Sequence, residues 1–212
     1  MGTTLITPIK EDVFSLDDIE SGINKLANGK DKYIEGYQGE ILKMGRSILI
    51  PYLHKLLNLA IMHGFPRIWT QSLIVTIFKN GDKSVSSKYR TIMVIHILTK
   101  LYGLILEKNL NLWLESQGKR AKGQVSFRRH HSTIDHLVTL RIIAEECRNS
   151  KVDLFCYFVD FRKYFDVVPQ DKLWEGLKEI MVPPKVRIVV ICLYETITAK
   201  LMTNEEWSKD IK

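Results

Sequence analysis

The stretch Phe155-Cys-Tyr-Phe-Val-Asp160-Phe-Arg-Lys-Tyr-Phe165-Asp166 decides the fold prediction for this chain of 212 residues. From Leu154 to Val159 the residues are apolar or aromatic without a break and are typical of strands, with no polar alternation. The pattern predicts a buried strand that ends at Asp160. A carboxylate at a strand end, beside the cations Arg162 and Lys163, is half of what a metal-assisted phosphoryl-transfer site needs.

A plainer interpretation of the same residues stays open. Asp160 can cap the short helical turn that starts at Phe161, and Asp166 can cap or solvate its other end. On chemistry alone this capping role is favoured, because one carboxylate does not make a metal site.

Composition narrows the class of protein. With 45% hydrophobic and 26% charged residues the chain can bury a core, and its length fits one to two domains. The net charge of +7 favours a polyanionic partner, nucleic acid before a membrane surface. No secretory pattern opens the chain, and no apolar run reaches the roughly 18 residues that span a bilayer. We expect an intracellular protein, in nucleus or cytoplasm, with no membrane partner.

The three cysteines Cys147, Cys156 and Cys192 are odd in number and widely spaced, with no Cys-x-x-Cys pair. This spacing indicates neither a disulfide framework nor a zinc site, and predicts buried thiols in a reducing compartment. His130, His131 and His136 offer a weak zinc alternative, since no other ligand is near them in sequence.

Residues 73–78 and 89–95 are rich in β-branched residues and are separated by Asn80-Gly81 and a serine-rich loop, which predicts a β-hairpin. Lys79 and Arg90 lie near its tip and base. Two such cations suit a triphosphate, with Lys as a point charge and Arg as a fork. The alternative is that both are solvated surface charges.

Apolar periodicity predicts a first helix that starts at Ser15-Leu-Asp17-Asp18 and ends before Gly29, and further helices over residues 51–62, 97–116, 133–148, 172–179 and 186–198. Ser15 and Ser132 are expected as N-caps and Pro51 in a first turn. Trp174 is expected in the core. The third helix reads as a core helix, and the fourth is expected to turn one apolar set inward: Ile134, Leu137, Val138, Ile142 and Ile143.

The most basic part of the chain is the loop after Gly118, which holds Lys119, Arg120, Lys122 and the pair Arg128-Arg129, with no acid between Glu115 and Asp135. A cationic loop suits a nucleic-acid backbone, because phosphate contacts need charge without sequence readout. A solvated loop is the alternative.

Three motifs in order carry a resemblance to one family. The string Phe158-Val-Asp160-Phe161-x-Lys163-x-Phe165-Asp166 resembles the first palm motif of reverse transcriptases of non-LTR (LINE-type) retrotransposons. The resemblance implies that Asp160 is catalytic and binds Mg²⁺, with the metal site at Asp160 and Phe161. It implies that Phe165 is the gate that crowds the 2'-hydroxyl of a ribonucleotide. Tyr164 stands where the family usually has Ala.

The other two motifs precede it. The set Pro66-x-x-Trp69, Ile74, Ile77, Lys79, Gly81-Asp82 and Tyr89-Arg90 resembles the fingers motif of the same family, which implies that Lys79 and Arg90 are nucleotide-binding residues that close over phosphates. Gln124, Phe127-Arg128 and Ser132-Thr-x-Asp135 resemble its template-contacting motif. Gln124, Arg128 and Arg129 are therefore the candidate template-binding residues.

The resemblance implies an α+β protein with a partial right-hand polymerase fold: fingers and the start of the palm, helix-rich, with a fingers β-hairpin and a palm strand. We expect a lead-in over 1–20, fingers and the fingers-palm junction over 21–150, and the N-terminal part of the palm over 151–212. The family's Gln-Gly motif and its aromatic-Ala-Asp-Asp hairpin are absent, and the only Asp-Asp pair is Asp17-Asp18.

Two functions follow from the resemblance. The first is an RNA-directed DNA polymerase of a retrotransposon that extends a DNA primer on an RNA template, using Mg²⁺ and deoxynucleoside triphosphates. The alternative is a catalytically inactive nucleic-acid-binding fragment of a decayed element, because the second carboxylate motif is missing.

Overall fold

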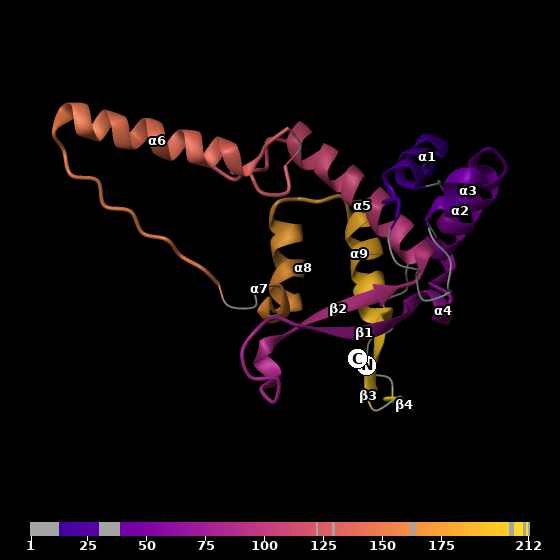
Figure 1. Ribbon diagram of the computed structural model, residues 1–212. Helices are drawn as coiled ribbons and strands as arrows, with labels where there is room; N and C mark the ends of the chain where they lie inside the picture. Colours follow the sequence, from indigo (N-terminus) through magenta and orange to yellow (C-terminus); the bar gives the residue numbers. More distant parts are fainter. Residues whose placement is uncertain are drawn as a thin grey trace. The chain divides into compact units, whose positions relative to one another are not determined.

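The computed structural model describes residues 13–29, 39–121, 123–128, 130–161, 164–203, 206–209 and 211. The chain forms two compact units, unit 1 (Met1–Asn109 with Val182–Lys212) and unit 2 (Leu110–Met181). The fold is α+β and rich in helices, as predicted (Figure 1). The predicted boundaries of fingers and palm stay a prediction.

The helices are α1 (Leu16–Lys25), α2 (Glu40–Met44), α3 (Arg46–His63), α4 (Arg67–Thr70), α5 (Ile97–Ser116), α6 (Thr133–Ser150), α7 (Tyr164–Val167), α8 (Gln170–Glu179) and α9 (Pro184–Thr196), with a 3₁₀ turn at Ser86–Lys88. The strands are β1 (Gln71–Phe78), β2 (Tyr89–Ile95), β3 (Thr198–Thr203) and β4 (Glu206–Trp207).

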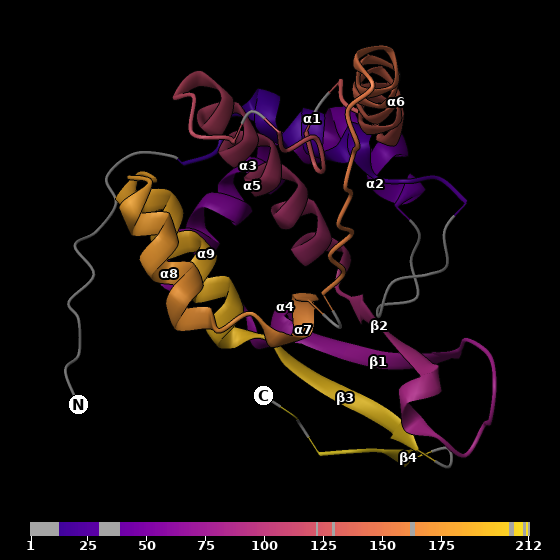
Figure 2. The ribbon, with the colours of Figure 1, turned by 90° about the vertical axis from the view of Figure 1, so that its left-hand side faces the viewer.

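A mixed four-stranded sheet with the order β2-β1-β3-β4 lies in unit 1 (Figure 2). The antiparallel pair of β1 and β2 runs in register from Ser72↔Ile95 to Phe78↔Tyr89, which confirms the predicted hairpin. The neighbour on the other side, β3, is parallel to β1. The prediction of helix up to Thr198 is wrong at its end, because Thr198 instead begins β3 and its carbonyl accepts a hydrogen bond from the Ser72 hydroxyl at 2.8 Å.

The core of unit 1 forms where α1, α3 and α5 turn their apolar faces to one another. Tyr102 of α5 lies at its centre, with edge-to-face rings Phe14 and Phe65 at centroid distances of 5.1 and 4.9 Å. Asn58 ties the chain ahead of α1 to this core, since its Oδ1 accepts from the amides of Val13 (2.8 Å) and Phe14 (3.0 Å). These bonds satisfy backbone groups that would otherwise be buried without partners.

The helix predicted to begin at Pro51 begins at Arg46, so the expected first-turn role of Pro51 is wrong. The extra turn is anchored at Gly45, whose carbonyl accepts from the amides of Ile48 (3.0 Å) and Leu49 (2.9 Å). Pro51 lies inside α3 and removes one intrahelical donor there.

Unit 2 contains the end of α5 with α6, α7 and α8, and none of its described residues is buried. Ser132 caps α6 in a capping box with Asp135, as the sequence predicts. The inward face predicted for α6 is wrong: Ile134, Leu137, Val138, Ile142 and Ile143 are all exposed. Trp174 is half-buried rather than in the core, and Cys156 is exposed rather than a buried thiol.

The predicted buried strand ending at Asp160 is also wrong. Residues 152–161 carry no regular secondary structure, and Phe155, Tyr157 and Phe158 are 78, 90 and 86% exposed. A strand is stable only when its amides and carbonyls pair with a neighbouring strand. The described residues supply no such neighbour for this segment.

None of the described helices is long and apolar enough to cross a membrane.

Candidate nucleic-acid interface

The β1–β2 hairpin of unit 1 carries a cationic face. Arg90 lies opposite Ile77, and the pairing continues one step further, where the Lys79 amide donates to the Lys88 carbonyl at 2.9 Å. Residues opposite one another in an antiparallel pair, and residues two apart on a strand, point to the same side. The pairing therefore places Lys79, Lys88 and Arg90 on one face of the ribbon.

All three cations are exposed, and none has an ion-pair partner within the part of the chain that the structure describes. The acid in the connecting loop, Asp82, is held locally: its Oδ1 accepts from the Ser84 amide (2.9 Å) and hydroxyl (2.8 Å). These bonds lower the pKa of Asp82. Neighbouring like charges repel, so an anion with several charges is the natural counterpart of this face.

The opposite face of the hairpin is aromatic. Phe78 and Tyr89 are cross-strand partners with ring centroids 5.3 Å apart, and Lys83 Nζ lies 5.9 Å from the Phe78 centroid. The Tyr89 hydroxyl donates to the Lys83 carbonyl at 3.0 Å. These contacts stiffen the loop that joins the strands, and a stiff loop holds the cations at fixed spacing.

In unit 2 the basic loop folds back onto the end of α5. Arg128 makes a bidentate pair with Glu115, with Nε 2.9 Å from Oε1 and Nη2 3.0 Å from Oε2. Arg120 Nε lies 3.2 Å from the same Oε1, without hydrogen-bond geometry, and its Nη2 donates to Asn111. The expected template-binding Arg128 is thus neutralised by a carboxylate of its own unit.

Exposure limits the strength of this pairing. The side chains of Arg128 and Glu115 are 25 and 40% exposed, and ion pairs at such sites are worth about 0.2–1 kcal/mol. A phosphate with its full charge can therefore compete for the guanidinium. Gln124 is exposed, and its backbone N–H donates to the Ala121 carbonyl at 3.1 Å.

A cavity of about 440 Å³ lies beside this pair and is lined by Asn111, Leu112, Glu115, Arg128, His130 and His131. His131 Nδ1 is 3.2 Å from Asp135 Oδ2, so the start of α6 faces the same loop. His130 and Phe127 adopt left-handed backbone conformations, with φ of 61° and 57°. The loop is therefore built of tight turns.

Asp160 is exposed and lies in the irregular segment 152–161. Phe161, the other residue of the implied metal site, is 67% exposed, and its ring lies tilted by 49° against that of Tyr164, with centroids 5.6 Å apart. Throughout the described ranges no three His, Cys, Asp or Glu side chains come close enough to hold a metal ion. A lone carboxylate does not make a two-metal site.

Several expected residues fall outside what the structure describes. Arg129, Arg162 and Lys163 are among them, and the side chain of Phe165 is another, although its backbone belongs to α7. Their roles as template contact, neighbouring cations and gate stay predictions.

The sequence predictions do not include two residues of this interface. Lys88 joins the hairpin cations, and its position directly before the predicted strand 89–95 and two residues before Arg90 could have revealed it. Glu115 pairs with Arg128 across thirteen residues, and the sequence pattern holds no comparable signal.

No protein-family model matches the chain. The chain is 27% identical over 181 residues to a Drosophila melanogaster protein named "Probable RNA-directed DNA polymerase from transposon BS". The match covers 84% of this chain and 20% of that protein, so the chain spans about a fifth of this relative's length. The similarity supports a relationship with reverse transcriptases.

Proposed function

We propose that this chain is part of an RNA-directed DNA polymerase of a LINE-type retrotransposon. In this proposal it binds the phosphates of nucleic acid or of an incoming deoxynucleoside triphosphate. The cationic face of the hairpin carries the proposal, because Lys79, Lys88 and Arg90 lie together on one exposed face. The similarity over 84% of the chain supports the same assignment.

The basic loop of unit 2 is proposed as a second phosphate contact, through Gln124, Arg128 and Arg129, along an RNA template and DNA primer. The guanidinium of Arg128 is paired with Glu115, and it can bind a phosphate only when that phosphate displaces the carboxylate. Binding at this loop should therefore be weaker than at the hairpin.

For the chemistry, Asp160 is proposed as one carboxylate ligand of Mg²⁺. Nucleotidyl transfer by two metal ions needs further carboxylates from a second element. The alternative for this chain by itself is a nucleic-acid-binding protein without polymerase activity.

Binding is tested by fluorescence anisotropy on an RNA–DNA template-primer over a range of salt concentrations. Lys79→Ala with Arg90→Ala should weaken binding and reduce the slope of log K against log salt by about one unit for each lost phosphate contact. Lys55→Ala with Lys100→Ala removes the same charge from exposed helical positions and is the matched control. Equal losses in both double variants would mean that net charge alone binds the nucleic acid.

The role of Glu115 is tested in the same assay. Glu115→Gln keeps the size of the side chain but removes the charge that holds Arg128, so the affinity should rise several-fold at low salt. Glu145→Gln removes the same charge from α6, where Glu145 pairs with Arg141, and is the control. An unchanged affinity of Glu115→Gln for the template-primer would mean that Arg128 does not contact the nucleic acid.

Polymerase activity is tested by primer extension on an RNA template with Mg²⁺ and deoxynucleotides, comparing the chain with Asp160→Asn. Extension that disappears in the variant would support the enzyme. No extension from either chain, with template binding retained, would support the inactive binding protein.

A further inference from the structure

The loop between β1 and β2 presents an exposed serine beside the hairpin cations. Ser86 begins the single 3₁₀ turn Ser86–Lys88. The hydroxyls of Ser84 and Tyr89 in the same loop have partners, but that of Ser86 makes no hydrogen bond to a described residue. An exposed hydroxyl without a partner on a surface loop is accessible to an enzyme that modifies serine.

Cations flank Ser86 on both sides. Lys83 lies three residues before it and Lys88 two residues after it, and both are exposed. No acid occurs from Lys83 to Tyr89. Protein kinases select serines by the pattern of charges around them, and a kinase with an acidic substrate groove is complementary to this pattern. The charges of the loop therefore favour phosphorylation at Ser86.

Ser84, two residues earlier, differs from Ser86 in its bonding. Its hydroxyl and its backbone N–H both donate to Oδ1 of Asp82, at 2.8 and 2.9 Å. The Asp82 carboxylate would repel a phosphate added at Ser84. The side chain of Ser87 lies outside the described residues. Of the two serines whose side chains the structure describes here, only Ser86 combines an unbonded hydroxyl with cationic neighbours.

The turn that holds Ser86 can open for an enzyme. A kinase binds its substrate serine in an extended conformation, so the loop must change shape on binding. The 3₁₀ turn is closed by two backbone hydrogen bonds, from the Lys88 N–H to the Val85 carbonyl at 3.0 Å and from the Tyr89 N–H to the Ser86 carbonyl. A single 3₁₀ turn in an exposed loop opens readily, because water replaces its hydrogen bonds.

We propose that Ser86 is a phosphorylation site and that its phosphate switches off nucleic-acid binding by the hairpin. The switch rests on the proposed function, whereas the site itself does not. In the reaction the Ser86 hydroxyl oxygen bonds to the γ-phosphorus of ATP, and the bond from that phosphorus to the bridging oxygen breaks, so ADP leaves. The hydroxyl proton passes to the catalytic base of the kinase. The product carries a charge of about −1.5 to −2 at neutral pH.

This charge would lie beside the cations of the hairpin. Two residues of chain span at most about 7 Å, so a phosphate on Ser86 lies within one Debye length of Lys88, about 8–10 Å. Arg90 follows two residues further, on the same face as Lys88. Lysine and arginine bind phosphoserine through charge-assisted hydrogen bonds. The phosphate would therefore occupy these cations from within the chain and repel the phosphates of nucleic acid.

The site is tested on the full chain with purified protein kinase C and ATP. Mass spectrometry of peptides should place a phosphate on Ser86, and Ser86→Ala should lose it. The phosphorylated chain is then titrated with the RNA–DNA template-primer by fluorescence anisotropy. Its affinity at low salt should fall about tenfold or more, and the slope of log K against log salt should fall by about one to two units, since one or two phosphate contacts are lost.

Two glutamate variants separate position from net charge. Ser86→Glu puts a negative charge beside the hairpin cations and should weaken binding. Ser47→Glu adds the same charge at an exposed position in the first turn of α3 and should not. A chain that takes no phosphate at Ser86, or that takes it and binds the template-primer as before, would overturn the proposal. Failure of the unmodified wild type to bind would overturn the proposed function and the switch with it, while the mass measurement decides the modification separately.

Discussion

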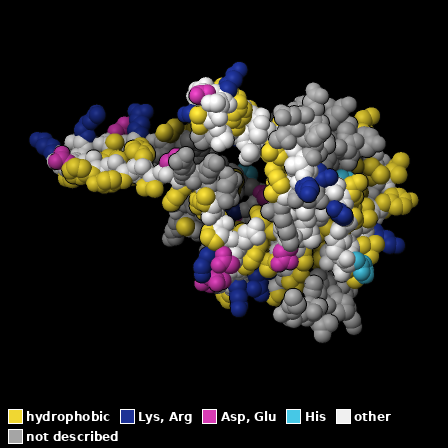
Figure 3. Space-filling model, turned by 90° about the horizontal axis from the view of Figure 1, so that it is seen from below, with side chains coloured by type: hydrophobic (Ala, Val, Ile, Leu, Met, Phe, Trp, Pro, Cys, Tyr) yellow, Lys and Arg dark blue, Asp and Glu magenta, His cyan; other side chains and the backbone are white. Residues whose placement is uncertain are grey.

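Both units contain sets of apolar residues, but among the described residues only unit 1 buries them in a core. Unit 1 buries one connected cluster that includes Phe14, Ile23, Leu57, Leu101 and Tyr102. Unit 2 also has apolar residues, on α6 and in the segment 152–161, yet none of its described residues is buried. In Figure 3 apolar side chains are exposed at the left, where α6 lies. Apolar content supplies the driving force for a core, but only a facing element makes one.

The polar contacts differ in the same way. In unit 1 they join distant parts of the chain, such as Asn58 with Phe14 and Ser72 with Thr198, 44 and 126 residues apart. In unit 2 the side-chain hydrogen bonds and ion pairs between described residues reach no further than the thirteen residues between Glu115 and Arg128. Unit 1 is therefore held by tertiary packing, and unit 2 by local structure.

The largest expected difference between the units concerns a buried and an exposed leucine. Leu57 on α3 is fully buried, whereas Leu137 on α6 is 61% exposed. Leu57→Ala should lower the free energy of unfolding of unit 1 by about 2–5 kcal/mol, because it leaves a cavity in a packed core. Leu137→Ala removes the same atoms and should change stability by about 0.5 kcal/mol or less.

Urea unfolding followed through the NMR signals of core amides in unit 1 measures the first effect, and the signals of α6 measure the second. Comparable losses from the two variants would mean that α6 packs against something in solution, and the contrast between the units would fail.

A smaller contrast concerns two helical glycines. A Cβ added at Gly22 of α1 would lie 2.7 Å from Ile105 Cγ1 and 2.8 Å from Leu101 Cδ1, both in fully buried side chains. Gly22→Ala should therefore cost about 1–3 kcal/mol through overpacking. At Gly176 of α8 nothing lies within 4 Å, and Gly176→Ala should stabilise its helix by about 0.5–1 kcal/mol.

Thermal unfolding of the two glycine variants checks this pair. Gly22→Ala should lower the unfolding temperature and Gly176→Ala should raise it. An unchanged unfolding temperature in Gly22→Ala would show that α1 and α5 are not in tight contact.

Local sequence patterns predicted the local structure well. The helix from Ile97 to Ser116, the β1–β2 hairpin and the capping residues Ser15 and Ser132 all follow from periodicity and short-range hydrogen bonding, and the structure confirms them. The grouping of Lys79 with Arg90 on the hairpin follows from the same patterns.

Non-local pairing is what the sequence could not supply. The strand β3 exists because Thr198 and its neighbours meet β1 from the far end of the chain, which no short window records. Conversely, the run from Leu154 to Val159 has the composition of a buried strand, but composition does not provide the neighbour that a strand needs. The candidate carboxylate Asp160 lies outside any regular element for the same reason.

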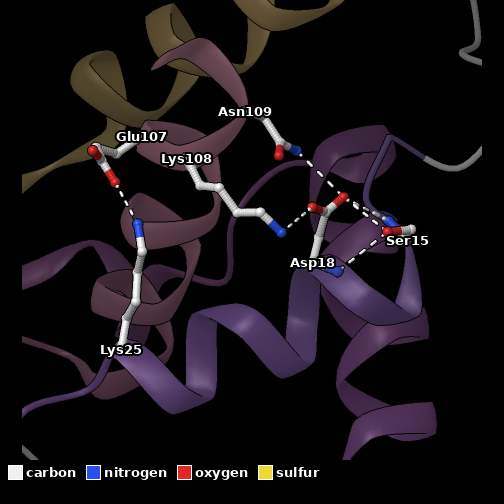
Figure 4. A network of polar contacts seen from close by, with 6 residues as sticks. All are labelled: Ser15, Asp18, Lys25, Glu107, Lys108 and Asn109. Atoms are coloured by element: carbon white, nitrogen blue, oxygen red, sulfur yellow. Dashed lines mark hydrogen bonds and ion pairs between the residues drawn. The ribbon is translucent and has the colours of Figure 1, made fainter. Parts of the chain in front are cut away.

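The smallest expected difference lies in two capping boxes of the same kind. Ser15 and Asp18 cap α1, and Ser132 and Asp135 cap α6. Figure 4 shows what distinguishes the first box: Asp18 Oδ1 lies 3.1 Å from Lys108 Nζ, and Asn109 contacts Oδ2 from the same helix, α5. Burial raises the pKa of Asp18, but hydrogen bonds from Ser15, Lys108 and Asn109 outweigh it and leave the pKa below the ordinary value of 3.8.

A carboxyl whose pKa is lowered by folding stabilises the fold above its unfolded pKa, and this contribution is lost as the pH falls through the folded value. Asp18→Asn should therefore reduce stability by about 1 kcal/mol at neutral pH, and the gap to the wild type should close as the pH drops below about 4. Among the described residues Asp135 pairs only with the partly exposed His131, at 3.2 Å, so Asp135→Asn should cost less at neutral pH. Urea midpoints of both variants between pH 3 and pH 7 measure the difference. A gap for Asp18→Asn that is independent of pH would mean that the link between α1 and α5 is made by shape and packing rather than by the charge of Asp18.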